Sequence, residues 1–431
     1  MSTALGVLLI SFALLLFGGA PVFVVLALPS ALYLILEGLP LELVPQRIFT
    51  GIDIFLLLAI PLFMLAGEVM NAGRLTDRLV EFSQALVGKV RGGLAMVNVL
   101  TSMLFAGITG SAAADASAIG SMMIPMMSKQ GYPRAFSVSV TAASSIVGPI
   151  IPPSIVFIMY GVLASTSIID LFLAGVVPGI LLGLSQIAVI QLVAKRRGFA
   201  AGQPTSVRKI FSTGRRAVPA MVLPFIILAG ILGGVFTPTE AGAVAVLYGF
   251  IVAGLLYRRL NAPTVLAMGL NVGRSLGELM LIIGASNLLA WILVAEQVPV
   301  RIAEGMLWVS SDPTVLLLMI NVLLFFVGMF LDTFPALIIL TPILLPIAQT
   351  IGVEPLHLGV IMVLNLMVGT VTPPVGVCLF IACNIGNVEV EAAIKEILPF
   401  ILASMGVVLL ITFVPELSTT LPTLFREWTA P

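Results

Sequence analysis

Gly110-Ser111-Ala112-Ala113-Ala114-Asp115 interrupts the middle of an apolar stretch that runs over residues 92–128. A second apolar stretch, 313–349, is broken in the same way by Leu331-Asp332-Thr333-Phe334-Pro335. In lipid, a non-helical turn is tolerated only where protein or water surrounds it. Each stretch is therefore expected to be a re-entrant helical hairpin, which enters the membrane, turns near mid-depth and leaves on the same side.

The composition around these hairpins excludes an ordinary soluble protein. Of 431 residues, 60% are apolar and 9% are charged, and the formal net charge is zero, whereas a soluble domain carries roughly 25% charged residues. The balanced charge also argues against a nucleic-acid partner. We expect an all-α polytopic membrane protein in a lipid bilayer, with ten crossings at about 4–17, 21–36, 52–70, 137–162, 171–194, 218–236, 240–257, 278–295, 358–384 and 397–415.

The distribution of basic residues predicts the orientation. If the N-terminus is outside, ten crossings and two hairpins leave only Arg47, Arg301 and Arg426 on the outer side. All other Lys and Arg residues, including the acid-free run in 195–217, then fall in the cytoplasm, as the positive-inside rule requires. We interpret 195–217 as a basic cytoplasmic loop, and a partner-binding patch is the less favoured alternative.

The same loop divides the chain into two similar halves, 1–194 and 218–431. Phe105-Ala106-Gly107 aligns with Phe326-Val327-Gly328, and Pro152-Pro153 aligns with Pro373-Pro374 at the same offset and without gaps. Five crossings per half make the second copy enter from the opposite side. Inverted repeats with broken helices are typical of secondary transporters whose sites lie near the midplane.

A Val-Gly-x-x-x-Pro-Pro pattern follows each hairpin, at 147–153 and at 368–374. Paired prolines remove two backbone donors and push the preceding residues out of the α region. We expect unwound helix at about 145–154 and 366–376, where free carbonyls can bind a small cation. A simple proline kink is the alternative, and it is less favoured because the pattern occurs twice in equivalent positions.

Each predicted hairpin tip combines a helix N-terminus, which favours an anion, with a helix C-terminus whose carbonyls favour a cation. Oxygen-bearing side chains at the first tip are those of Thr109, Ser111, Asp115 and Ser117, and at the second those of Asp332, Thr333 and Thr341. Asp115 fits helix capping about as well as a functional role. Asp332, among apolar neighbours, favours a functional role at membrane depth.

Several other polar residues are assigned ordinary structural roles. Glu68, Glu278 and Glu296 are expected near membrane interfaces, and His357 is expected to be solvated or to cap a helix. With a single histidine, the chain has no HExxH motif and no Ser/His/Asp set, and no phosphate-binding loop occurs. An enzyme is not expected, although an intramembrane enzyme using Asp115 and Asp332 as a carboxylate pair is the alternative from another functional class.

Four ordered motifs resemble the large membrane (M) subunit of the tripartite ATP-independent periplasmic (TRAP) transporters, which is similar to the ion transporter superfamily. The motifs extend over most of the chain, and they lie at 110–116 with Ile124-Pro125, at 148–154, at Thr237-Pro238-Thr239-Glu240-Ala241 and at 368–376. The resemblance implies a scaffold domain and a transport domain that moves as an elevator. It also implies a sodium-coupled importer of dicarboxylates, sialic acid or similar carboxylates in the bacterial or archaeal inner membrane. A small four-helix membrane subunit and a periplasmic substrate-binding protein would be its partners, and a stand-alone sodium/anion symporter is the alternative.

The resemblance also implies particular site residues. One sodium ion would be bound by the first tip and the unwound segment behind it, and a second by the second tip and its unwound segment. The substrate carboxylate would lie between the tips. The residues that match are Ser111, Asp115, Ser145 and Gly148 for the first sodium ion, Asp332, Thr333, Gly369 and Thr372 for the second, and Ser111, Ser154 and Asp332 for the substrate.

Overall fold

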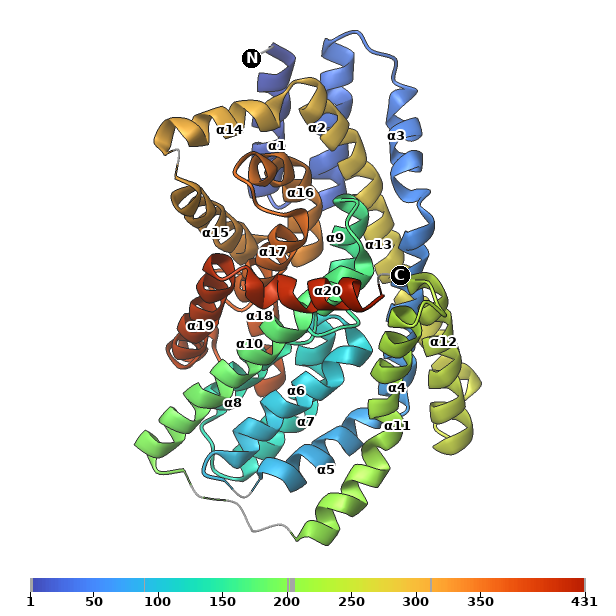
Figure 1. Ribbon diagram of the computed structural model, residues 1–431, viewed down its shortest axis with the longest axis vertical. Helices are drawn as coiled ribbons and strands as arrows, with labels where there is room; N and C mark the ends of the chain where they lie inside the picture. Colours follow the sequence, from blue (N-terminus) through green and yellow to red (C-terminus); the bar gives the residue numbers. More distant parts are fainter. Residues whose placement is uncertain (1–2, 89, 200, 202–205, 311, 430–431) are drawn as a thin grey trace.

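The computed structural model describes residues 3–88, 90–199, 201, 206–310 and 312–429, and every regular element in these ranges is helical (Figure 1). A single β-bridge between Arg91 and Ala201 is the only strand-like pairing in the described part. The helices are α1 (Thr3–Phe17), α2 (Val22–Leu36), α3 (Leu43–Ile52), η1 (Phe55–Leu58), α4 (Ala59–Ala72), α5 (Leu75–Val87), α6 (Gly93–Thr109), α7 (Ala112–Lys129), α8 (Arg134–Ser145), α9 (Ile155–Leu163), α10 (Ile168–Arg197), α11 (Val207–Leu232), α12 (Pro238–Phe250), η2 (Ile251–Leu256), α13 (Ala262–Ala295), α14 (Val298–Val309), α15 (Pro313–Phe330), α16 (Thr333–Thr350), α17 (Pro355–Gly369), α18 (Val377–Gly386), α19 (Val390–Phe413) and α20 (Glu416–Thr429).

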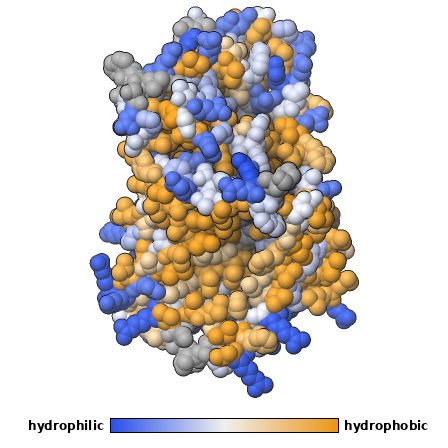
Figure 2. All heavy atoms as spheres, viewed as in Figure 1, coloured by the Kyte–Doolittle hydropathy of each residue, from blue (hydrophilic) through white to orange (hydrophobic). Residues whose placement is uncertain are grey.

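The all-helical membrane fold expected from the composition is confirmed. Within the described residues, eight helical segments are long and apolar enough to cross a bilayer. Hydrophobic residues cover most of the face in Figure 2 below its upper third, and hydrophilic residues gather at the upper end and along the lower edge. The eight segments are 55–72, 168–197, 207–232, 238–256, 262–295, 313–330, 333–350 and 390–413.

Two of the predicted crossings are each divided into a pair of short helices. The segment 137–162 consists of α8 and α9, which are separated by residues 146–154. The segment 358–384 consists of α17 and α18, which are separated by residues 370–376. Each separating segment contains two adjacent prolines, which cannot donate helical hydrogen bonds. Polypeptide that leaves the helical conformation is thus present in both halves of the chain.

Both hairpins turn within one or two residues. Gly110 ends α6 with φ of 58°, a left-handed conformation that glycine adopts without strain. Ser111 then caps α7, and its hydroxyl accepts a hydrogen bond from Ala114 N at 3.4 Å. Between α15 and α16, Leu331 is extended and Asp332 takes the N-cap position. Each tip therefore presents the N-terminus of its second helix.

The long helix α13 corrects the predicted span 278–295, because it begins at Ala262. Its 34 residues extend about 51 Å, well beyond the roughly 30 Å hydrocarbon core. Asn271, Arg274 and Ser275 lower the hydropathy of its first half without breaking the helix. Hydropathy located only the more apolar second half of this helix.

The basic loop is also shorter than the predicted 195–217. Helix α10 continues to Arg197, and α11 begins at Val207 behind the cap Ser206, whose hydroxyl accepts from Lys209 N at 3.3 Å. Residues 200 and 202–205 lie outside the described part. The start of α1 lies near one end of the long axis, and the end of α10 and the start of α11 lie near the other (Figure 1). Which end faces outward stays a prediction.

Three short amphipathic helices lie across the long axis. In Figure 1, α5 is near the lower end, α14 is near the upper end, and α20 crosses the middle. Helix α20 is held at both ends, by an ion pair of 2.5 Å between Arg426 and Asp170 and by a 2.7 Å hydrogen bond between Ser418 Oγ and His357 Nδ1. His357 is buried under α20, so the expectation that it is solvated is wrong. Its Nε2 donates to Thr412 O at 3.3 Å in the last turn of α19, which fits the expected capping role.

Candidate functional site

The two hairpin tips meet at a small cavity of about 50 Å³. Ser111 reaches it from the first tip, and Asp332 and Thr333 reach it from the second. The structure thus brings together three of the residues that the sequence singles out. The remaining walls come from both hairpins and from the segments behind them, and they comprise Gly110, Ala112, Ala113, Pro149, Val156, Phe334, Met367, Thr370 and Cys378.

The residues predicted for the first sodium ion lie close together behind the first tip. Asp115 is fully buried one turn into α7, and its backbone N–H donates to Ser111 O at 3.0 Å. A methyl group on Gly148 would collide with Asp115 Oδ2, so this backbone position lies directly against the carboxylate. Gly148 N donates to Ser145 O at 3.3 Å. The cap of α7 is Ser111, which leaves the Asp115 carboxylate facing the separating segment.

The residues predicted for the second sodium ion are only partly together. Thr333 is 2% exposed, and its hydroxyl has no hydrogen-bond partner among the described residues. Asp332 is exposed at the tip and lines the cavity. Thr372 instead donates its hydroxyl to Val368 O at 2.7 Å. Thr372 and Gly369 lie behind the cavity wall, and Gly369 packs against the backbone of Gly328.

Thr370 and Cys378 line the tip cavity, although the sequence did not single them out. Thr370 O accepts a hydrogen bond from Cys378 N at 3.0 Å, which joins the end of α17 to the start of α18. Thr370 lies in the same Val-Gly-x-x-x-Pro-Pro run as Gly369, so the run was a signal for its position. No comparable signal marked Cys378, whose place depends on how α18 packs.

Ser154, predicted to bind substrate, does not line the cavity between the tips. It is fully buried, and its hydroxyl accepts from Phe157 N at 3.2 Å as the cap of α9. The same hydroxyl donates to Pro149 O. Both hydrogen-bonding functions are therefore used inside the protein. For Thr109, also named at the first tip, the side chain lies outside the described part.

A hard cation such as sodium suits the oxygen donors at the tips. No group of three His, Cys, Asp or Glu side chains that could hold a metal ion occurs in the described ranges. A cation here would depend on hydroxyl, carbonyl and single carboxylate oxygens, which are the donors that hard ions prefer. The buried Thr333 hydroxyl without a partner fits such a ligand, since a buried polar atom left unpaired is costly.

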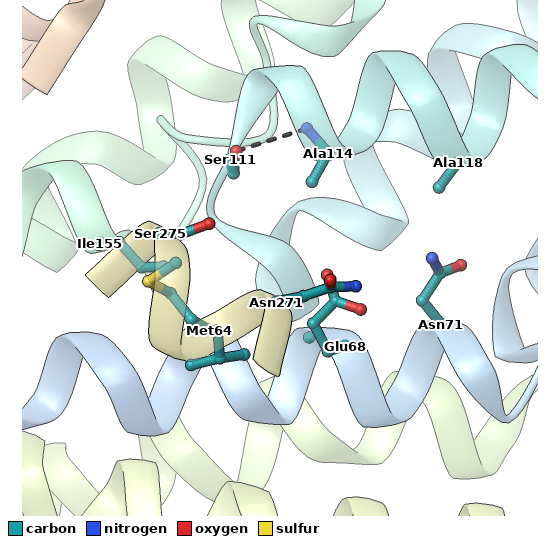
Figure 3. Close-up of a pocket in the computed structure, with 11 residues that line it drawn as sticks. Met64, Glu68, Asn71, Ser111, Ala114, Ala118, Ile155, Asn271 and Ser275 are labelled. Carbon is teal, nitrogen blue, oxygen red and sulfur yellow. Dashed lines mark hydrogen bonds between the residues drawn. The ribbon is translucent and has the colours of Figure 1, made fainter. Parts of the chain in front are cut away.

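A larger cavity of about 160 Å³ adjoins the first tip on the side that faces α4 and α13 (Figure 3). Ser111 lines this cavity as well as the small one. Its walls are Ser111, Ala114, Ala118 and Ile155 from the hairpin side, Met64, Gly67, Glu68 and Asn71 from α4, and Asn271, Val272 and Ser275 from α13. Glu68 is half-buried and lines this cavity, and its place near a membrane interface stays a prediction.

A third hollow of about 480 Å³ continues from the second one toward α5. The two share Asn71 and Ala118. Polar side chains from α7 (Ser117, Ser121) face others around the start of α5. The hollows together mark a route, partly polar near the first tip and mostly polar near α5, from the first tip to the end of the molecule at which α5 lies (Figure 1).

Comparisons with known proteins agree with this architecture. Residues 9–417 match the family described as "Tripartite ATP-independent periplasmic transporter, DctM component". The chain is 39% identical to the C4-dicarboxylate TRAP transporter large permease protein of Pseudomonas aeruginosa, over 87% of this chain and 88% of that protein. It is 36% identical to the sialic acid TRAP transporter large permease protein of Vibrio cholerae, over 95% and 96%.

Among solved structures, the YdaH transporter of Alcanivorax borkumensis is similar, with a TM-score of 0.64 over 88% of each chain. The sequence identity is 16%, so this likeness concerns the fold alone.

Proposed function

Because the chain belongs to the DctM component family of the tripartite ATP-independent periplasmic transporters, we propose that it is the translocating subunit of a sodium-coupled importer of small organic acid anions. It is a multi-pass membrane transporter protein and not an enzyme. The observation that carries the proposal is the convergence of two helix N-termini, those of α7 and α16, on one cavity between the tips.

A carboxylate group of the substrate is the proposed ligand of the cavity between the two helix N-termini. Helix N-termini carry partial positive charge and unpaired N–H groups, which favour anions. Ser111 adds a hydroxyl at the point where the small and the larger cavity meet. The names of the relatives, which specify C4-dicarboxylate and sialic acid, support a carboxylate without identifying which one this chain carries.

Sodium is the proposed coupling ion. Asp115 with Ser145 and Gly148 would hold one ion behind the first tip, together with Ser111. Asp332 and Thr333 would hold the other, and the partnerless Thr333 hydroxyl supports this assignment. Bound sodium would supply positive charge beside the carboxylate and so favour binding of ion and anion together.

An elevator motion is the proposed mechanism. The hairpins with α8, α9, α17 and α18 would move as the transport domain against a scaffold that contains α4 and α13. The route of hollows from Ser111 to Asn71 and Arg74 supports a conformation open toward the α5 end, which is the predicted cytoplasmic side.

We further propose two partners, a small four-helix membrane subunit and a periplasmic binding protein that delivers the substrate. The word "tripartite" in the family description supports this arrangement. The alternative of a stand-alone symporter predicts uptake by this chain alone in proteoliposomes.

Uptake measurements test the proposal. Proteoliposomes with the chain and both partners should take up an organic acid only under an inward sodium gradient. Full uptake in potassium-only buffer would contradict sodium coupling. Full uptake without the binding protein would favour the stand-alone symporter.

A further inference from the structure

The cavity between the first tip and the helices α4 and α13 has one ionisable side chain among the described residues that line it, Glu68. The other polar lining groups are Asn71, Asn271, Ser275 and Ser111, all of which are neutral. No lysine or arginine lines it, and Glu68 takes part in neither of the ion pairs in the described ranges. A carboxylate therefore faces a space that adjoins the proposed anion site.

The arrangement of these groups is fixed by two helices. Asn271 and Ser275 are one turn apart on α13, so they lie on one face of that helix. In Figure 3, Glu68 and Asn71 project from α4 toward α7, and Asn271 meets Glu68 from the side. Ser111 lies on the opposite wall, at the N-terminus of α7. The cavity thus has the Ser111 hydroxyl and the N-terminus of α7 at one end, and the Glu68 carboxylate flanked by the Asn71 and Asn271 amides at the other.

The size of the cavity matches this division. The space between the tips measures about 50 Å³, enough for an ion and a little water. The adjoining space of about 160 Å³ has room for the body of a small organic acid. An anion held at Ser111 would therefore extend its other end toward Glu68 and Asn271.

We propose that this cavity is the subsite for the far end of the transported molecule, and that Glu68 selects monocarboxylates with a hydroxyl or ammonium group at that end. This inference rests on the proposed function. A carboxylate accepts hydrogen bonds from hydroxyl and ammonium donors, and such charge-assisted bonds are stronger than neutral ones. A second carboxylate on the ligand would meet like charge, which disfavours C4-dicarboxylates.

Four probes that differ only at the far end test the proposal. Butyrate, 4-hydroxybutyrate, 4-aminobutyrate and succinate share one carboxylate and a four-carbon chain. Their dissociation constants are measured with the full chain in lipid nanodiscs in sodium buffer. The wild-type chain should bind 4-hydroxybutyrate and 4-aminobutyrate at least tenfold more tightly than succinate.

Three variants locate the effect. Glu68→Gln keeps the shape and removes the charge, so the preference over succinate should fall to threefold or less. Asn271→Asp adds a second carboxylate at the same end and should widen the preference. Glu278→Gln makes the same change on the exposed part of α13, outside this cavity, and should leave the order unchanged.

Several results would overturn the proposal. One is that the wild-type chain binds succinate most tightly of the four probes. Another is that Glu68→Gln leaves the order of the four dissociation constants unchanged. A third is that no probe binds although sodium still stabilises the protein. The melting temperature in sodium against potassium, without any probe, reports separately on the proposed function. If sodium gives no stabilisation at all, the sodium-coupled transporter itself is in question.

Discussion

Thr333 has the hydroxyl that most directly tests the second sodium site, because it is buried without a hydrogen-bond partner in the described part of the chain. Thr341, on the same helix, is equally buried, but its hydroxyl donates to Leu337 O at 2.6 Å. The two threonines form a matched pair. The Thr341 hydroxyl is used in a hydrogen bond within the protein, and the Thr333 hydroxyl could bind an ion.

Replacing Thr333 with valine should therefore weaken sodium binding at least tenfold without lowering the free energy of unfolding. The substitution removes an oxygen ligand but breaks no protein hydrogen bond, and removing an unpaired buried hydroxyl is even expected to stabilise by about 1 kcal/mol. The midpoint of sodium-dependent thermal stabilisation measures the affinity. Thr341→Val is the control, and an equal loss of sodium affinity in both variants would contradict the assignment.

Gly148 tests the first site through its contact with Asp115. Gly148→Ala places a methyl group against Asp115 Oδ2, so the carboxylate or the separating segment must move. We expect a destabilisation of about 1–3 kcal/mol and the loss of sodium-driven uptake.

Gly269→Ala serves as the control for that substitution. A Cβ at Gly269 meets nothing within 4 Å, and the residue lies inside α13. There alanine should be neutral or stabilise by up to about 1 kcal/mol. Normal uptake in Gly148→Ala would show that the position of the Asp115 carboxylate is not critical.

At the scale of elements, the ion pair between Arg426 and Asp170 joins the amphipathic helix α20 to the long helix α10. Its contribution to stability can be measured. The Asp170 side chain is 9% exposed and the Arg426 side chain is 63% exposed. Because most of the arginine side chain is exposed, the attraction should be screened and contribute about 1 kcal/mol or less.

A double-mutant cycle with Asp170→Asn and Arg426→Gln should give a coupling free energy of this size, measured from unfolding in detergent. The coupling should shrink at high salt, since exposed charges are screened. A cycle on Arg197 and Glu396, whose ion pair of 2.9 Å joins α10 to α19, provides a comparison. A coupling of several kcal/mol, insensitive to salt, would be inconsistent with a solvent-screened pair.

At the scale of the whole molecule, the route of hollows predicts which side reaches the first tip. Ser121 is exposed on α7 and lines the hollow toward α5. In a chain whose two buried cysteines are replaced by alanine, Ser121→Cys should react with a membrane-impermeant maleimide in inside-out vesicles and only weakly in right-side-out vesicles.

Glu37→Cys is the matched control for orientation, because Glu37 is exposed and directly follows α2, which lies toward the opposite end from α5 (Figure 1). It should be labelled only in right-side-out vesicles. The reverse pattern for both variants would place the N-terminus inside. Labelling of Ser121→Cys from both sides would argue against a conformation closed toward the outside.

Sequence and structure differ most where helices from distant parts of the chain meet. Hydropathy placed the apolar helices, but polar residues such as Asn271 and Ser275 hid the first half of α13. The local sequence did not indicate which groups surround Glu68, His357 and Ser154. In the structure, α20 covers His357, α7 and α13 face Glu68, and Pro149 and Phe157 are the hydrogen-bond partners of the Ser154 hydroxyl.

The sequence by itself determined that the protein lies in a lipid bilayer, that its fold is helical and where the two hairpin tips are. These features depend on composition and on local signals such as Gly110 and Ser111 at a helix break. Only the tertiary structure decided that Ser111 borders two cavities, that Thr333 keeps an unpaired hydroxyl and that Glu68 faces the first tip. Those properties belong to surfaces built from helices far apart in the chain. Their positions follow from packing, on which a local pattern carries no information.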